Sequence, residues 1–177
     1  MSDHDLAANK ALARRFIEGV NRRSLEEMER LLHPDFVWNT AVVADDAPNE
    51  LRPLQSKRLR GTNLPHPKPR LDRAETLAFF AGFFGERSGG ALTSIKEGGG
   101  APLTASADHG HMQVTILSMT AEEDRVAVEA SSTGIANPAN GKRYGNFYHL
   151  LMRMKDGQVV LYKEYQDTLH VYDYMAD

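Results

Sequence analysis

Apolar residues near the N-terminus recur with helical spacing. One helical face carries apolar residues at i, i+3, i+4 and i+7: Ala13, Phe16, Ile17 and Val20. Ser24 followed by Glu27 is the capping-box pattern that begins a second, short helix. That helix ends at His33-Pro34, because the residue before a proline avoids the helical conformation. Residues 35–39 then predict a short strand.

The middle of the chain contains one predicted helix between two long loops. Asp72 as N-cap, with Glu75 three residues later, predicts the start of this helix, which stops near Gly85. Periodicity is lost over residues 41–71 and again over residues 86–108. Loops of this length are uncommon in compact domains and often form lids or binding segments. We therefore expect either a lid or a plain insertion at 41–71.

The last seventy residues predict a β-sheet. Turn residues separate four strand-like segments: 111–119, 126–135, 143–155 and 159–165. Asn140-Gly141 and Asp156-Gly157 are strong hairpin signals, so we expect a four-stranded antiparallel meander, followed by a short helix at 168–175. Helices followed by strands indicate the α+β class. We expect residues 1–177 to form a single domain.

The turns also predict which side chains share a face of the sheet. Counting back from a two-residue loop at Asp156-Gly157 gives these pairs: Tyr148 with Tyr165, Asn146 with Asp167 and, on the opposite face, His149 with Glu164. The same count from Asn140-Gly141 places Thr133 beside Tyr148. A polar group at one end of an apolar face is typical of a small-molecule site. A slip of one residue would move every one of these side chains to the other face.

Composition and charge exclude several function classes. Lys and Arg number 21 against 24 Asp and Glu, a net charge of −3, so nucleic acid is not an expected partner. The chain has no cysteine, which excludes disulfides and thiol chemistry. No apolar run is long enough to span a membrane, and the N-terminus lacks the apolar stretch of a signal peptide. We expect a cytoplasmic protein.

Both ends of the chain carry a familiar pattern. The sequence Arg15-Phe16-Ile17-Glu18-Gly19-Val20-Asn21 and the segment 31–38 resemble the nuclear transport factor 2-like superfamily. The segments 155–159 and 163–170 look like its SnoaL-like branch of polyketide cyclases and ketosteroid isomerase relatives. The resemblance implies a cone in which a curved antiparallel sheet wraps around helices and encloses an apolar pocket. It also implies a homodimer or higher homo-oligomer, and chemistry without a cofactor.

The resemblance suggests one acidic residue and argues against two activities. Asp167 matches the last-strand acidic residue of limonene epoxide hydrolase and the polyketide cyclases. Phe16 and Thr40 stand where ketosteroid isomerase has its essential tyrosine and base, so steroid isomerisation is not expected. The Arg–Asp pair of epoxide hydrolases is missing from segment 128–133, so ordinary epoxide hydrolysis is not expected either.

These considerations give a candidate site. Asp167 is the predicted base, although its carboxylate has an alternative role as cap of the terminal helix. Three residues are predicted to hold or polarise the substrate oxygen: Asn146, Tyr148 and His111. Four residues are predicted to contact substrate: Trp38, Tyr165, Phe80 and Thr133. Phe80 belongs to a phenylalanine cluster that also suits a core. His109 and His111 lack a clear third ligand, so we expect no metal.

The sequence thus predicts a cofactor-independent lyase, isomerase or cyclase. Its substrate would be a small hydrophobic or aromatic compound with a hydroxyl or carbonyl group. Two alternatives are a non-catalytic small-molecule binding module and a protein-interaction domain.

Overall fold

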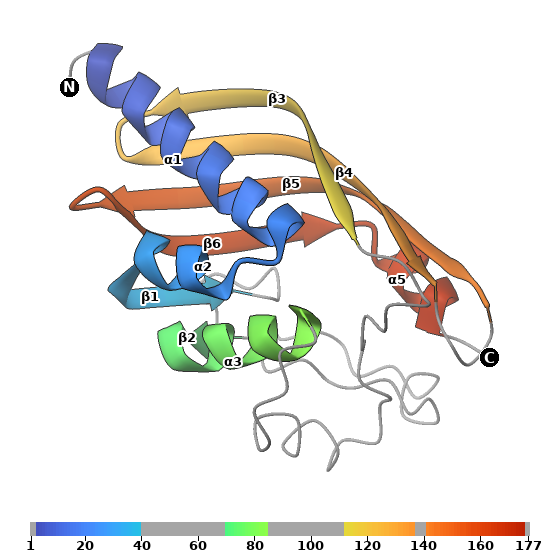
Figure 1. Cartoon of the computed structure of the whole chain (residues 1–177). Coiled ribbons are helices and arrows are strands. Elements are labelled where there is room, and N and C mark those ends of the chain that lie inside the picture. The colour runs from blue at the N-terminus through green and yellow to red at the C-terminus, as the bar shows by residue number, and fades with distance from the viewer. Residues whose placement is uncertain (1–2, 40–69, 85–111, 137–140, 176–177) are drawn as a thin grey trace, which may run out of the picture.

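The computed structural model describes residues 3–39, 70–84, 112–136 and 141–175 (Figure 1). The helices are α1 (Asp3–Arg22), α2 (Leu25–Leu31), α3 (Arg73–Phe84) and α5 (Thr168–Met175). The strands are β1 (Leu32–Asn39), β2 (Arg70–Asp72), β3 (Gln113–Glu122), β4 (Arg125–Ala136), β5 (Arg143–Lys155) and β6 (Gln158–Gln166). Most of the predicted loop 41–71 lies outside the described residues, which resume at residue 70. The whole predicted loop 86–108 and His111 also lie outside them.

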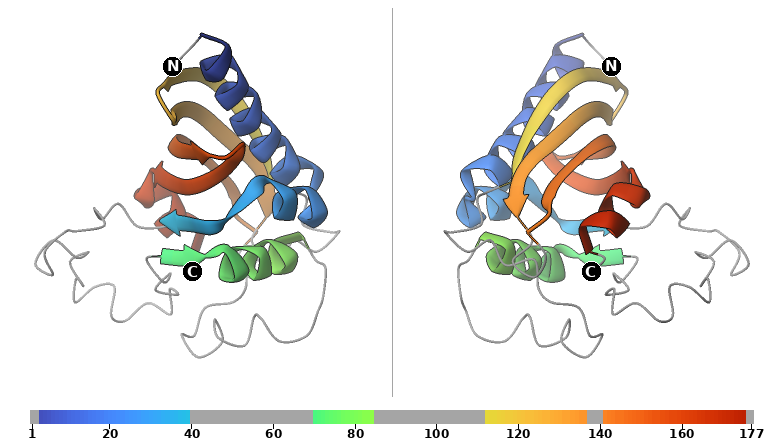
Figure 2. Two further views of the ribbon diagram at one scale, coloured as in Figure 1. Left: turned by 90° about the vertical axis from the view of Figure 1, so that its left-hand side faces the viewer. Right: turned by 90° about the vertical axis from the view of Figure 1, so that its right-hand side faces the viewer.

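The strands form one open, six-stranded mixed sheet in the order β2-β1-β6-β5-β4-β3. The antiparallel meander β3 to β6 is confirmed, and β1 lies parallel to β6. The short strand β2, at the end of the predicted loop, was not expected and pairs with β1. The sheet curves around the first three helices, which cover part of its inner face (Figures 1 and 2). The predicted α+β class and cone-like architecture are therefore confirmed.

Local signals fix the starts of α2 and α3 as predicted, whereas α2 ends at Leu31, before the predicted stop at His33-Pro34. The Glu27 amide donates to Ser24 Oγ over 3.3 Å at the start of α2. At α3 the capping box is reciprocal: the Glu75 amide donates to Asp72 Oδ1 over 2.9 Å, and the Asp72 amide donates to Glu75 Oε2 over 3.0 Å. After α2 the chain turns extended at Leu32, so β1 begins three residues before the predicted strand.

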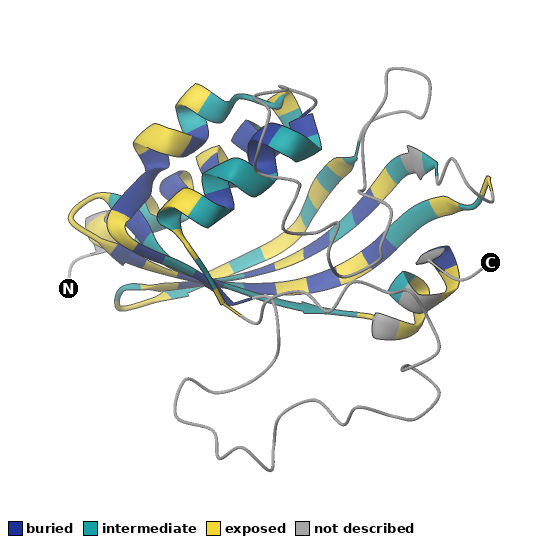
Figure 3. Cartoon of the chain, turned by 90° about the horizontal axis from the view of Figure 1, so that it is seen from below, coloured by how far each residue is buried: buried dark blue, intermediate teal, exposed yellow. Residues whose placement is uncertain are grey.

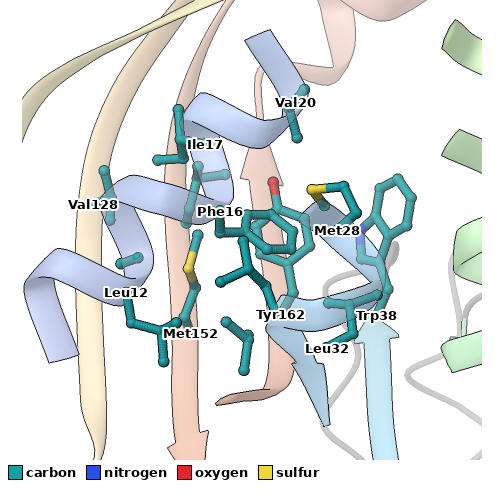
Figure 4. Packing of buried hydrophobic residues seen from close by; sticks show 14 of the residues in the cluster. Leu12, Phe16, Ile17, Val20, Met28, Leu32, Trp38, Val128, Met152 and Tyr162 are labelled. Atoms are coloured by element: carbon teal, nitrogen blue, oxygen red, sulfur yellow. The ribbon is translucent and has the colours of Figure 1, made fainter. Parts of the chain in front are cut away.

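The core lies between the helices and the inner face of the sheet (Figure 4). The predicted face of α1 is buried against β-strand side chains, with Phe16 2% exposed. The Phe16 ring lies 5.1 Å from that of Tyr162 on β6. Within the described residues, no helix is long and apolar enough to cross a membrane.

The register predicted for β5 and β6 is wrong beyond the turn. Arg153 pairs with Leu161 and Met154 with Val159, so Val160 is an extra residue on β6 and forms a bulge. Beyond the bulge the pairing is shifted by one residue: Tyr148, for example, pairs with Gln166 and not with Tyr165. As a result Tyr165 faces outward, beside His149 and not beside Tyr148.

The register predicted for β4 and β5 is also wrong. The turn is longer than the predicted two residues, because Ala136 pairs with Arg143, and a bulge follows between Thr133 and Ile135, where Gly134 has a φ of 118°. Ser132 therefore pairs with Asn146, and Thr133 pairs with Gly145. Ser132 is buried on the inner face, whereas Thr133 is exposed.

Candidate functional site

A chain of hydroxyl groups crosses the inner face of the sheet. Ser132 Oγ on β4 and Tyr148 OH on β5 are 2.9 Å apart. The Tyr148 hydroxyl donates to Tyr144 OH over 2.9 Å, and Tyr144 in turn donates to Gln166 Oε1 on β6 over 3.2 Å. Burial raises the pKa of Tyr144 and of Tyr148, so both phenols stay protonated. The chain is therefore a row of neutral groups with a defined direction of donation.

Asn146 holds Tyr144 within this row. Its Nδ2 donates to Tyr144 OH over 3.2 Å and to the Asp167 carbonyl over 3.0 Å. Its Oδ1 accepts from the Asp167 amide over 3.2 Å and from the Phe147 amide over 2.8 Å. Asn146 is 3% exposed, and both ends of its amide are occupied. It lies on the predicted face and joins β5 to the start of α5.

The Asp167 side chain serves as a helix cap. Its Oδ1 accepts from the Leu169 amide over 2.9 Å, and its Oδ2 lies 4.0 Å from His170 Nε2. The side chain is 49% exposed at the start of α5. This geometry is the alternative interpretation of Asp167, in which the carboxylate satisfies the first turn of the terminal helix. A carboxylate so exposed lacks the apolar surroundings that would adapt it to base catalysis.

Glu164 is the acidic residue that the bulge brings onto the inner face. It lies directly opposite Leu150, between Tyr162 and Gln166 on the same side of β6. Loss of hydration on burial raises the pKa of the Glu164 carboxyl to about 7, and the Trp38 indole acts in the opposite direction. The described residues give this carboxylate no salt bridge.

The carboxylate is electrostatically coupled to its tyrosine neighbours. Burial is the main cause of the raised pKa of Tyr162, and the negative charge of Glu164 adds to it. Glu164 also adds to the raised pKa of Tyr144 and Tyr148. One ionisable carboxyl and three neutral phenols therefore share this part of the inner face.

Aromatic rings form the other side of the site. Trp38 on β1 is paired with Tyr162 in the parallel register, and their ring centroids are 5.6 Å apart. Phe80 on α3 stacks on Trp38 at 5.6 Å with an interplanar angle of 8°. Two of the four predicted contact residues, Trp38 and Phe80, are buried in the core cluster. The Trp38 indole influences the site because it lowers the pKa of Glu164.

The helices α1, α2 and α3 cover only one part of the inner face. In Figure 3, α1, α2 and α3 lie over one part of the sheet, and no described helix covers the part near α5. The bonds from Asn146 to Asp167 place the row of hydroxyls next to α5. The polar groups thus gather at the end of the sheet beyond the described helices. No group of three or more potential metal ligands occurs among the described residues.

No family model and no curated protein matches the chain. Solved structures do share its fold. One is a protein from Jannaschia sp. CCS1 assigned as a SnoaL-like polyketide cyclase, with 17% identity, a TM-score of 0.60, and coverage of 96% of this chain and 92% of that one. A second is TerC co-crystallised with polyporic acid, with 14% identity, a TM-score of 0.56 and coverage of 95% and 98%.

A third similar structure is an epoxide hydrolase of the limonene epoxide hydrolase type from M. tuberculosis. It is 11% identical, with a TM-score of 0.55 and coverage of 97% of this chain and 91% of that one. At these identities the likeness establishes the fold, and the chemistry has to be argued from the site. The predicted nuclear transport factor 2-like, SnoaL-like fold is confirmed.

Proposed function

We propose that this chain, which has the nuclear transport factor 2-like fold, is a cofactor-independent enzyme of the lyase, isomerase or cyclase type. It acts by proton transfer on a small hydrophobic or aromatic compound that carries a hydroxyl or carbonyl group. Glu164 is its base, in the role that the sequence suggested for Asp167. The substrate binds against the inner face of the sheet, between the aromatic side chains and the row of hydroxyls.

The protonation state of Glu164 carries the proposal. A general base works best when its pKa lies near the working pH, and that of Glu164 is raised to about 7. A partly buried carboxylate without a cation lowers the stability of the fold when it is ionised, which favours a chemical role over a structural one. Glu164 accepts a proton from carbon or oxygen of the substrate and returns it to another atom of the same molecule or to the leaving group.

The tyrosines suit the stabilisation of developing negative charge. Tyr144 accepts from both Tyr148 and Asn146, so its hydroxyl is well prepared to donate strongly. Its own proton now points to Gln166 Oε1, and a substrate oxygen would compete for it. Asn146 is then a positioning residue. His111 stays a proposed second acid or base.

The experiment compares two carboxylates in one assay. Purified protein without added metal or cofactor is incubated with lipophilic hydroxy and carbonyl compounds, and product masses are followed. Glu164→Gln should lower turnover by at least about 100-fold. Asp167→Asn is the matched control, because asparagine also caps helices, and it should retain most of the activity. Loss of turnover in Asp167→Asn alone would overturn the assignment of the base.

The mass change names the reaction class. No change indicates an isomerase or a cyclase, loss of water a dehydratase, and loss of a carbon fragment a lyase. Compounds that stay bound to the protein without reacting would favour the alternative function, a small-molecule binding module. One observation supports that alternative: the hydroxyls of Tyr148 and Tyr144 are already satisfied by protein acceptors.

A further inference from the structure

Trp38 holds its indole N–H in a fixed and unsatisfied position. The ring is 8% exposed and is held by Phe80 at 5.6 Å and by Phe79 at 4.9 Å in an edge-to-face contact. Its Nε1 is buried and has no hydrogen-bond partner among the described residues. Buried donors are nearly always satisfied in native proteins. A buried donor without a partner therefore calls for an explanation, and a ligand that accepts its hydrogen bond is one.

The neighbouring acceptor is the Glu164 carboxylate, which has no salt bridge among the described residues. Trp38 is paired with Tyr162, and Glu164 follows two residues later on the same face of β6. In Figure 4 the indole nitrogen lies on the side of the ring that faces Tyr162. The indole N–H favours the charged form of Glu164 as a hydrogen-bond donor does, although the contact does not reach the geometry of an ordinary hydrogen bond. The Trp38 N–H and the Glu164 carboxylate are therefore neighbours that do not fully satisfy each other's hydrogen bonding.

We propose that a hydroxyl group of the ligand binds between Trp38 and Glu164, accepting a hydrogen bond from the indole N–H and donating one to the carboxylate. The inference rests on the proposed site at Glu164 and narrows its substrate class to alcohols and phenols. A carbonyl oxygen accepts but cannot donate to the carboxylate. An ammonium group donates but cannot accept from the indole, so of these groups only a hydroxyl satisfies both.

The choice of hydroxyl also agrees with the charge of the inner face. The strand residues that face the helices include Glu164 but no lysine or arginine in the described part of β4, β5 and β6. A carboxylate or phosphate ligand would lie beside this acidic group without a cation to compensate it. A neutral hydroxyl avoids that repulsion.

Three probes of similar shape test the inference. They are 2-naphthol, 2-methoxynaphthalene, which accepts but cannot donate, and naphthalene, which does neither. Calorimetry at pH 8, where most of the Glu164 carboxyl is ionised, gives the affinity of each. The wild-type protein should prefer 2-naphthol over 2-methoxynaphthalene by at least about tenfold.

Variants then assign the preference to its two groups. Trp38→Phe keeps an aromatic ring but removes the N–H, and Glu164→Gln removes the charge; each should reduce the preference for 2-naphthol several-fold. Phe79→Leu is the control, because it removes a ring contact of Trp38 without changing a hydrogen-bonding group. It should weaken the three probes equally and keep the preference.

Equal binding of 2-naphthol and 2-methoxynaphthalene would overturn the inference. So would a preference that Trp38→Phe leaves unchanged, or no binding of 2-naphthol at millimolar concentration. The result is separable from the proposed function. If no compound of the substrate panel reacts but 2-naphthol is still preferred, only the assignment of Glu164 as the base is rejected. If a compound reacts but 2-naphthol is not preferred, only the hydroxyl site is rejected.

Discussion

Glu164 lies directly opposite Leu150 in the sheet, so a carboxylate shares the inner face with a leucine that is 2% exposed. The register counted back from Asp156-Gly157 instead predicts Glu164 opposite His149, on the other face of the sheet. The difference comes from the extra residue Val160, which forms a bulge on β6. A one-residue change in register therefore decides which acidic residue belongs to the candidate site.

The raised pKa of Glu164 has a consequence for stability. Its pKa is about 7 in the folded protein against an ordinary value of 4.5, so between these pH values the folded state binds more protons than the unfolded state. The contribution of Glu164 to stability is therefore fully present below pH 4.5 and is lost as the pH rises through 7. The loss amounts to at most roughly 3 kcal/mol.

Glu164→Gln removes this loss. The difference in unfolding free energy between this variant and the wild-type protein, measured with denaturant, should favour the variant more at pH 8 than at pH 4.5. The change between the two pH values should be roughly 1–3 kcal/mol. Asp167→Asn makes the same change of charge at an exposed cap and should not reproduce the rise. An equal effect of Glu164→Gln at both pH values would show that the carboxyl ionises normally.

The row of hydroxyls should contribute to stability through Tyr148. Tyr148→Phe removes the hydrogen bonds of the Tyr148 hydroxyl to Ser132 Oγ and to Tyr144 OH, each 2.9 Å long, and the Ser132 hydroxyl that loses its partner is buried. We expect a loss of about 1–3 kcal/mol in the free energy of unfolding. Tyr165→Phe on the outer face is the control and should change stability by less than about 0.5 kcal/mol. Equal effects of the two variants would contradict the observed register.

Asn146 should control the docking of α5. Its side chain bonds to both the amide and the carbonyl of Asp167, just before the helix. Asn146→Ala should cost about 1–3 kcal/mol and speed hydrogen exchange in residues 168–175 more than in α1. Exchange that accelerates uniformly along the chain would indicate general destabilisation and would contradict a local role.

The sequence predicted the parts of the fold that depend on local signals. The capping boxes at Ser24 and Asp72 and the order of the last four strands follow from residues close together in the chain. The long loops offered no such signals, and neither did strand β2, which depends on pairing with β1.

The register depended on a signal that the sequence only partly carries. Residues 159–162 read Val-Val-Leu-Tyr, an apolar run without alternation, so a bulge at Val160 cannot be inferred from it. Gly134 is different, because a glycine inside a strand suggests a bulge, and this signal would have moved Ser132 inward in place of Thr133. Glu164 could have been found only by weighing both registers of β6.

Titration of the Glu164 carboxyl tests the central claim most directly. Carbon-13 labelling of glutamate side chains and NMR across pH 3 to 9 would give its midpoint, with Glu164→Gln identifying the resonance. The structure predicts a midpoint near 7, in line with a pKa of about 7 for this carboxyl. A midpoint near the ordinary value of 4.5 would contradict its assignment as the base.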